Sequence, residues 1–324
     1  MMQHGGRKST ARPSARAETS RRLARALEGV RGAVTFDASL KALTSFKIGG
    51  IAEVLVKPAD ETDVARVCRQ SHDARLPVFV LGGTNVLIRD GGIRGIVVSL
   101  SNLKGIRNDA EGVVYAEAGV GMPTLLKHVI KHGLAGLEWA AGIPGTVGGC
   151  VVMNAGTRLG EMKDSLKAVR MAEPDGSIRD YLRTELQFEY RRTHLPPGIV
   201  VGAWLQLKPA TQSDVGHAIK DYLRYRKATQ PLTQPNAGCV FKNPSPRSAG
   251  HVIEAAGLKG LRVGDAQVST KHANFIVNLG KASAADVLGL IAEVQRRVRD
   301  QSGVELELEL KVIGETTRKG RRHV

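Results

Sequence analysis

The chain has 324 residues, of which 42% are hydrophobic and 24% are charged, a composition typical of a globular protein large enough for two domains. It contains no run of about 18 apolar residues and opens with no signal-peptide pattern, which argues against a transmembrane helix and against secretion. The three cysteines, Cys68, Cys150 and Cys239, have no paired spacing, so we expect reduced thiols in a cytoplasmic protein.

The net charge of +16 is partly concentrated at the two ends of the chain. We expect residues 1–20 and 315–324 to be basic, solvated tails, the first of them disordered. The first tail is rich in Arg and Ser, so an organelle transit peptide is an alternative. Only 4% of residues are aromatic and no nucleic-acid-binding motif is visible. We therefore expect no nucleic-acid partner, and the remaining positive charge suits an anionic small molecule.

The first half of the chain predicts short strands interrupted by helices. Residues 51–57 have the pattern of a strand, Asp60 can cap the helix that follows, and residues 77–81 form a second apolar strand. Strands are also predicted at 86–88, 95–100 and 113–118, with a helix over 122–132. The sequence Pro174-Asp175-Gly176 after residues 166–172 predicts a hairpin.

The second half predicts a strand over 199–207, a helix over 214–229 and a strand over 274–278. A long helix then begins at Ser283, with Asp286 three residues later, and residues 306–313 close as a strand. Strands and helices do not alternate regularly, which favours an α+β fold over a doubly wound sheet. We expect one domain over residues 21–210 and a second over 211–314.

Two glycine-rich loops stand out. Gly82-Gly83-Thr84-Asn85 lies between two predicted strands, and Gly142 to Gly149 contains a second concentration of glycine. Glycine has no Cβ and tolerates positive φ, so its backbone can approach a ligand and its N–H groups can hold phosphate. The first loop could also be a tight turn. Neither loop matches a P-loop or a Rossmann fingerprint.

Eight motifs follow one another along the chain: Thr44-Ser45-Phe46-Lys47-Ile48-Gly49-Gly50, Leu81 to Asp90, Gly136 to Gly149, Met153-Asn154-Ala155-Gly156, Phe188-Glu189-Tyr190-Arg191, Pro235 to Pro244, Lys271 to Asn278 and Leu306-Glu307-Leu308-Glu309. Together they resemble the UDP-N-acetylenolpyruvoylglucosamine reductase family over residues 40–314. The resemblance implies an FAD-binding domain of the vanillyl-alcohol-oxidase (PCMH) type with two subdomains, followed by a C-terminal α+β substrate-binding domain.

The same resemblance implies non-covalent FAD, NADPH as the reductant, and reduction of a UDP-linked enolpyruvyl amino sugar to UDP-N-acetylmuramate during peptidoglycan precursor synthesis. No tyrosine-bearing insertion follows Tyr190-Arg191, which indicates the shorter type II subtype. We expect a monomer that does not associate with membranes.

The resemblance points to three catalytic residues. Arg191 can hold a carboxylate with two hydrogen bonds. Cys239, which stands where the family commonly has serine, can donate a proton, because an unperturbed thiol with a pKa of about 8.5 is mostly protonated near neutral pH. Glu309 matches the family's catalytic glutamate, although a solvent-facing position beside Glu305 and Glu307 on an alternating strand is the alternative.

The binding residues follow from the glycine loops and from the resemblance. The candidates for FAD are Gly82, Gly83, Thr84, Asn85, Gly142, Ile143, Pro144, Gly145, Thr146, Gly148, Gly149 and Asn154, and those for the substrate are Tyr190, Arg191, Lys242 and Asn243. In the first loop, Leu81 or a one-residue deletion replaces the family's first glycine. His128 and His132 lack a third ligand, so we expect no metal site.

One flavoenzyme alternative remains open at this point. An oxidase of the same fold would act on an alcohol or a sugar and would often tether its flavin through His or Cys. No histidine adjoins either glycine loop in the sequence, which argues against the commonest tether.

Overall fold

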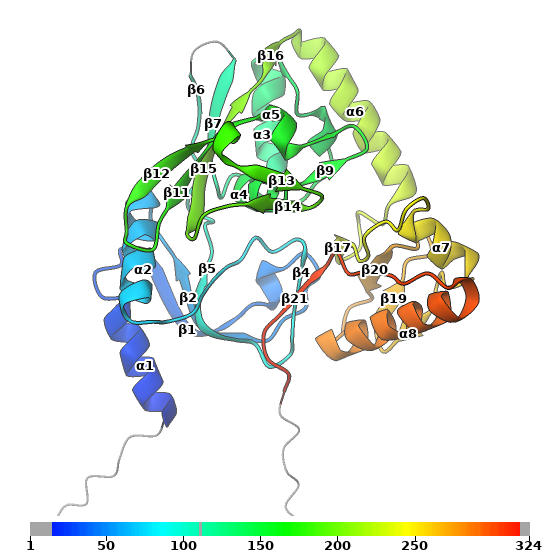
Figure 1. Ribbon diagram of the computed structural model, residues 1–324, viewed down its shortest axis with the longest axis horizontal. Helices are drawn as coiled ribbons and strands as arrows, with labels where there is room; N and C mark the ends of the chain where they lie inside the picture. The colour runs from blue at the N-terminus through cyan, green and yellow to red at the C-terminus, as the bar shows by residue number, and fades with distance from the viewer. Residues whose placement is uncertain (1–14, 110–111, 318–324) are drawn as a thin grey trace, which may run out of the picture.

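The computed structural model describes residues 15–109 and 112–317, which form three groups of elements (Figure 1). Most of the expected tails, residues 1–14 and 318–324, lie outside the described residues. Residues 15–20, which we expected in the N-terminal tail, belong to helix α1 (Ala15–Ala26), and Leu23 of this helix is buried in the first core. Glu315, expected in the C-terminal tail, is held by hydrogen bonds between its backbone and Gly91 and Gly92.

The first group is a four-stranded sheet. Its order is β1-β2-β5-β3, with bounds Ala33–Ser39, Ile51–Lys57, Ile93–Val98 and Val78–Val80. β2, β5 and β3 are parallel, and helix α2 (Glu61–Asp73) connects β2 to β3. Asp60 caps α2 as predicted, by accepting the Asp63 N–H at 2.9 Å. The first glycine loop therefore leaves the carboxyl end of β3.

The second group is a five-stranded antiparallel sheet. Its order is β12-β11-β15-β7-β6, with bounds Ile178–Leu182, Leu166–Ala172, Ile199–Gln206, Val113–Glu117 and Ile106–Asn108. The predicted hairpin is β11-β12, and Gly176 in its turn has a φ of +83°. Helices α3 (Met122–Lys131) and α4 (Val147–Val152) bury apolar residues in the same core, so α4 fixes the second glycine loop against this sheet.

Short elements connect the larger ones. The two-stranded pairs are β8 (Leu134–Ala135) with β16 (Lys208–Pro209), β9 (Gly156–Thr157) with β10 (Gly160–Glu161), and β13 (Gln187–Glu189) with β14 (Arg192–His194). Helix α5 spans Met162–Ser165, and 3-10 turns span Lys41–Leu43, Glu138–Ala140 and Arg183–Glu185. The turn between β13 and β14 carries Tyr190 and Arg191.

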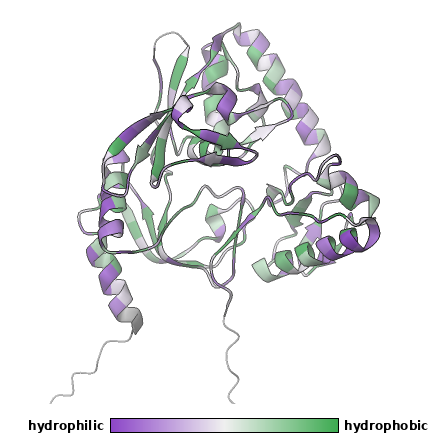
Figure 2. Cartoon of the chain, in the orientation of Figure 1, coloured by the Kyte–Doolittle hydropathy of each residue, from purple (hydrophilic) through white to green (hydrophobic). Residues whose placement is uncertain are grey.

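The C-terminal group has its own core. Its sheet order is β17-β20-β19-β18, with bounds Asn236–Cys239, Phe275–Asn278, Ala266–Val268 and Arg262–Val263, and its helices are α7 (Ala249–Ala255) and α8 (Ala284–Ser302). Ser283 caps α8 as predicted, with its Oγ 3.0 Å from the Asp286 nitrogen. α6 and α8 both carry hydrophilic and hydrophobic residues along their length (Figure 2), as expected of helices buried on one face.

The end of the chain returns to the first group. β21 (Lys311–Ile313) pairs in parallel with β4 (Val86–Ile88), directly after the first glycine loop. The predicted closing strand over 306–313 is therefore shorter than expected, and Leu308 makes only an isolated bridge to Phe241. This return brings Glu309 between the C-terminal group and the glycine loop.

Helix α6 (Gln212–Thr229) corrects the expected domain boundary. Val215, Ile219 and Tyr222 of this helix are buried in the first core, so the change from one core to the other follows Thr229 rather than residue 210. α6 runs from the five-stranded sheet towards the C-terminal group (Figure 1). The mixture of sheets and helices confirms the α+β class. Within residues 15–109 and 112–317, no helix is both long and apolar enough to cross a membrane.

Candidate active site

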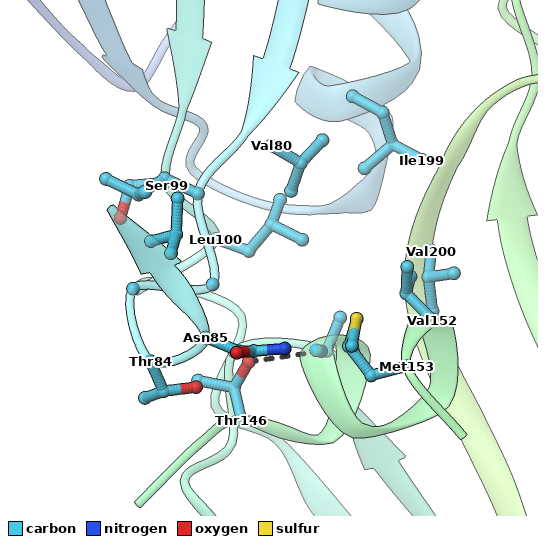
Figure 3. A pocket seen from close by; sticks show the side chains of 18 of the residues that line it. Val80, Thr84, Asn85, Ser99, Leu100, Thr146, Val152, Met153, Ile199 and Val200 are labelled. Atoms are coloured by element: carbon cyan, nitrogen blue, oxygen red, sulfur yellow. Dashed lines mark hydrogen bonds between the residues drawn. The ribbon is translucent and has the colours of Figure 1, made fainter. Parts of the chain in front are cut away.

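A cavity of about 840 Å³ lies between the β1-β2-β5-β3 sheet and the five-stranded sheet, and it is lined by the first glycine loop (Figure 3). Its walls come from the loop after β3, the end of β5, α4, β14, β15 and β21. Apolar side chains that face it include Val80, Leu100, Val152, Ile199 and Val200, while Lys104, Arg192 and Lys311 border it with positive charge. Partial burial and the neighbouring Arg192 lower the pKa of Lys311.

The first glycine loop is held by close backbone contacts. Gly83 has a φ of +79°, and a Cβ at this position would lie 2.4 Å from the Leu43 carbonyl oxygen. Ser45 donates its N–H to the Gly83 oxygen at 2.7 Å, and its hydroxyl lies 2.6 Å from the Asn236 oxygen of β17. Leu81, which replaces the family's first glycine, keeps a backbone bond to the Val98 oxygen and lines the cavity. The replacement therefore leaves the loop intact.

The second glycine loop has two halves with different surroundings. Gly142 has a φ of +80° and faces Arg226 and Leu223 rather than the cavity. Thr146 caps α4, with its Oγ1 3.4 Å from the Gly149 nitrogen. Gly148 and Gly149 line the cavity, and a Cβ at Gly148 would lie 2.8 Å from the Ala118 Cβ. Only the second half thus approaches a ligand in the cavity.

Arg191 and Glu309 form an ion pair close to this loop system. The Arg191 Nε lies 2.9 Å from the Glu309 Oε1, and only 22% and 11% of these side chains are exposed. Burial opposes the charge on Arg191, but Glu309 and Tyr190 outweigh it and raise the pKa of the guanidinium. The Tyr190 hydroxyl lies 3.4 Å from the Glu309 Oε2. Asn85 of the first glycine loop donates to the Glu309 backbone oxygen at 3.3 Å.

Cys239 ends β17 and adjoins this pair. Glu309 donates its backbone N–H to the oxygen of Val240, the next residue after Cys239, at 2.9 Å. Burial, followed by the negative charge of Glu309, raises the pKa of the Cys239 thiol to about 12, although Arg191 and Arg226 act in the opposite direction. The half-buried thiol therefore keeps its proton at neutral pH.

Arg226, on α6, is a site feature that our sequence reasoning missed. Only 9% of the residue is exposed. Its guanidinium donates to the Gln230 side-chain oxygen at 2.9 and 2.7 Å and to the Ala141 oxygen at 3.0 Å. Within the part of the chain that the structure describes, no carboxylate pairs with it. Burial lowers the pKa of Arg226, whereas Cys239 raises it, so this positive charge lies near the thiol.

Comparison with known proteins decides what this arrangement belongs to. Residues 230–313 match the family described as "UDP-N-acetylenolpyruvoylglucosamine reductase, C-terminal domain", and residues 52–181 match an FAD-binding domain. A UDP-N-acetylenolpyruvoylglucosamine reductase of Syntrophus aciditrophicus is 44% identical over 292 residues, which cover 88% of this chain and 94% of that relative. The chain belongs to the UDP-N-acetylenolpyruvoylglucosamine reductase family.

Two further members of the reductase family are similar to this chain. The reductase of Synechococcus elongatus is 46% identical over 281 residues, covering 85% of this chain and 93% of that relative. The crystal structure of the reductase of Thermus caldophilus superposes with a TM-score of 0.75 at 41% identity, covering 88% of this chain and 99% of that one. The chain is thus an FAD-dependent oxidoreductase with a PCMH-type FAD domain, which decides against the oxidase that the sequence left open. His194 does line the cavity, although no histidine adjoins the glycine loops in the sequence.

The cavity fits FAD. Its volume lies in the range of about 300–1,000 Å³ that is usual for cofactor sites. Apolar walls suit flat aromatic rings, the backbone of Gly82 and Gly149 has room where a Cβ would lie, and three cations can balance a diphosphate.

Most of the residues predicted to hold FAD line the cavity, but five do not. Gly82, Gly83, Thr84, Asn85, Thr146, Gly148 and Gly149 line it, whereas Gly142, Ile143, Pro144, Gly145 and Asn154 are not among its lining residues. Asn154 is fully buried, and its amide donates to Glu161 at 2.7 Å and accepts the Lys163 N–H at 3.0 Å. These hydrogen bonds give Asn154 a role in holding the α4–β10 connection, and its role in binding FAD stays a prediction.

The four predicted substrate residues lie in two different places. Tyr190 and Arg191 lie together at Glu309, with the guanidinium 4.8 Å from the Tyr190 ring centre. Lys242 pairs with Glu307 at the surface, and the Asn243 Oδ1 accepts the Ala249 N–H at 3.0 Å at the start of α7. The structure therefore gives Asn243 a role in supporting α7. The Glu307 side chain is 72% exposed and that of Glu309 only 11%, so the alternative of a shared solvent-facing strand does not fit Glu309.

Proposed function

We propose that this chain catalyses the NADPH-dependent reduction of UDP-N-acetylglucosamine enolpyruvate to UDP-N-acetylmuramate in peptidoglycan precursor synthesis. The observation that carries the proposal is the convergence of Arg191, Glu309 and Cys239 beside the glycine-loop cavity. FAD, when bound, supplies hydride transfer from NADPH to the alkene. The side chains around it must bind the substrate carboxylate and deliver a proton.

Arg191 is placed to receive the substrate carboxylate. Its Nε is engaged by Glu309, which leaves the terminal N–H groups of the guanidinium for a second anion. Negative charge moves toward the carboxylate when the alkene is reduced, giving an enolate-like intermediate, and a fixed positive charge stabilises it more than the starting alkene. Glu309 holds the guanidinium in place and can share a proton near the enolate.

Cys239 is the proposed proton donor to the neighbouring carbon. Its raised pKa keeps the proton on sulfur until an enolate-like carbon arrives to take it. The thiolate left behind lies close to the positive charges of Arg191 and Arg226 and regains a proton from water. The cysteine can thus take the place of the family's usual serine as proton donor.

The substrate carries a diphosphate in addition to its carboxylate. Arg226 provides a buried positive charge near the thiol that pairs with no described carboxylate, and buried charges are normally paired with an anion. We therefore propose that an anionic part of the substrate approaches Arg226. We further propose a cytoplasmic, monomeric enzyme that binds no nucleic acid.

The proposed activity is tested with purified protein, NADPH and UDP-N-acetylglucosamine enolpyruvate. Mass spectrometry should detect a product heavier than the substrate by two hydrogens, in amounts equal to the NADPH consumed. NADPH consumption without this product would refute the proposed reaction. A matched reaction with UDP-N-acetylglucosamine, which lacks the alkene, is the control and should yield no reduced product.

A further inference from the structure

Asn274 immediately precedes β20 and is almost completely buried, with 2% exposed. Its side-chain oxygen accepts the Phe241 N–H at 2.9 Å, and its amide nitrogen donates to the Phe241 oxygen at 2.8 Å. Its backbone oxygen accepts the Val240 N–H at 2.9 Å. Asn274 therefore holds, through hydrogen bonds, the two residues that directly follow Cys239.

The same side chain also influences the thiol. An asparagine amide carries two N–H groups, and only one is needed for the Phe241 oxygen. Cys239 pairs with Phe275, the residue after Asn274, across β17 and β20, and the Asn274 side chain acts to lower the pKa of the thiol, which favours the thiolate. Glu309 disfavours the thiolate, Arg191 and Arg226 favour it, and Tyr190 also interacts electrostatically with the sulfur. Among these neighbours, Asn274 contributes a neutral donor from the C-terminal core.

His272 fixes Asn274 from the other side. The His272 Nδ1 lies 3.2 Å from the Asn274 backbone nitrogen and accepts its N–H. The His272 ring packs edge-on against Phe275, with ring centres 4.9 Å apart. These contacts, together with the two bonds to Phe241, leave the Asn274 amide little freedom to turn away from Cys239.

We propose that Asn274 is a positioning residue for the proton-transfer step, holding the Cys239 sulfur in place and donating an N–H to it as its proton leaves. The proposal rests on the proposed function of Cys239. In the step, the S–H bond breaks, the proton joins the substrate carbon, and the electron pair stays on sulfur, where the Asn274 N–H binds it. The thiolate then takes a proton from water.

Asn278, four residues later, provides a matched control. It is also almost fully buried, with 3% exposed. Its amide donates to the Phe46 oxygen at 3.0 Å, and its Oδ1 accepts the N–H groups of Gly280 and Ala282 at 2.8 and 3.0 Å. It performs the same backbone-holding task, but its hydrogen bonds involve no residue next to Cys239. A purely structural role predicts equal effects at both asparagines.

The test compares Asn274→Leu with Asn278→Leu in the FAD-loaded protein. The first readout is the rate of Cys239 alkylation by iodoacetamide as a function of pH, read by peptide mass. Loss of the N–H makes the thiolate scarcer, so Asn274→Leu should slow alkylation about three- to tenfold at each pH, the range expected for the loss of one neutral hydrogen bond. Asn278→Leu should leave the rate within about twofold. Equal rates in the wild type and Asn274→Leu, or equal changes in both variants, would overturn the proposal.

The second readout is kinetic. Asn274→Leu should slow flavin reoxidation by the enolpyruvyl substrate while flavin reduction by NADPH stays unchanged, and the slowing should vanish in a Cys239→Ala background. A slowing that persists without the thiol contradicts the proposal. Alkylation requires neither substrate nor NADPH, so it remains decisive if the wild type proves not to reduce the enolpyruvyl sugar.

Two further measurements apply if Asn274→Leu does not fold. Asn274→Asp keeps the acceptor for the Phe241 N–H but loses both donors, and it should also slow alkylation. In ¹⁵N-asparagine-labelled protein, Cys239→Ala should shift the side-chain amide resonance of Asn274 more than that of Asn278. Equal shifts at the two residues would count against the hydrogen bond to sulfur.

Discussion

Replacing Cys239 with alanine tests the proton donor most sharply. A positioned general acid contributes about 10²- to 10⁴-fold to a rate, or about 2.7–5.4 kcal/mol at 1.36 kcal/mol per tenfold. Cys239→Ala should therefore slow reduction of the alkene by this factor. It should leave flavin reduction by NADPH unchanged, because that step needs no proton from the thiol. Cys239→Ser, which restores a hydroxyl, should recover much of the loss.

The raised pKa of the thiol sets the pH dependence of the same step. With a pKa of about 12, about one thiol in a thousand is ionised at pH 9, whereas about three quarters would be ionised at the ordinary value of about 8.5. The acid form is lost only as the pH rises through the folded-state pKa. Cys239 should therefore cause no alkaline fall in the rate of alkene reduction below about pH 10.

Stopped-flow absorbance of the flavin separates the two half-reactions. Anaerobic mixing with NADPH measures reduction, and mixing of the reduced enzyme with the enolpyruvyl substrate over a series of pH values measures reoxidation. The reasoning is refuted if Cys239→Ala reoxidises at the wild-type rate. It is equally refuted if the wild type shows an alkaline limb near pH 8.5 that disappears in this variant.

Three further substitutions test the site and its scaffold. Arg191→Lys keeps the charge at the same left-handed φ of +59° but loses the planar guanidinium. Because a charged hydrogen bond contributes about 1.5–3 kcal/mol, kcat/KM for the enolpyruvyl substrate should fall about ten- to a hundredfold. An unchanged kcat/KM in steady-state kinetics would show that Arg191 does not bind the substrate carboxylate. Asn154→Ala should lower the free energy of unfolding by about 2 kcal/mol or more, because it leaves buried partners unsatisfied, while the Kd for FAD changes less than about threefold. Weaker FAD binding at full stability, measured by titration and urea unfolding, would instead support its predicted cofactor role. Gly83→Ala should weaken FAD binding and lower the free energy of unfolding more than Gly257→Ala. Both positions have positive φ (+79° and +70°), but only Gly83 has backbone atoms within 4 Å of the added Cβ. Equal losses in the two variants would show that Gly83 is needed for its backbone conformation and not for close packing.

Local signals were enough to predict much of the fold. The caps at Asp60 and Ser283 and the hairpin turn at Gly176 depend on residues within a few positions of one another, and all three are confirmed. The position of α6 could not be predicted in this way. The helical spacing of its apolar residues does not show which core they face. Only the structure shows that they pack in the first core.

The site shows the same division between local motif and distant packing. The glycine loops and the motifs around Arg191, Cys239 and Glu309 were recognisable in the sequence, and these residues come together. The sequence did not predict that Asn154 holds Glu161 and Lys163 on the next connection, because these bonds depend on how the chain packs. Ser45 was visible within its motif, but its bridge from the glycine loop to Asn236 spans 191 positions of sequence.

Arg226 and Asn274 carried no signal of their own. Arg226 sits among other basic residues near the end of a helix, and only its burial beside Ala141 distinguishes it from them. Asn274 lies within a family motif, but its role depends on a strand pairing that brings Phe241 and Cys239 beside it. A sequence pattern does not specify either neighbourhood.

The most direct test of the whole account is the visible absorbance spectrum of the FAD-loaded protein without oxygen. NADPH should bleach the flavin band, and UDP-N-acetylglucosamine enolpyruvate should then restore it, with one equivalent of substrate consumed for each flavin reoxidised. A flavin that stays bleached in the presence of this substrate, or a protein that cannot be loaded with FAD, would contradict the account.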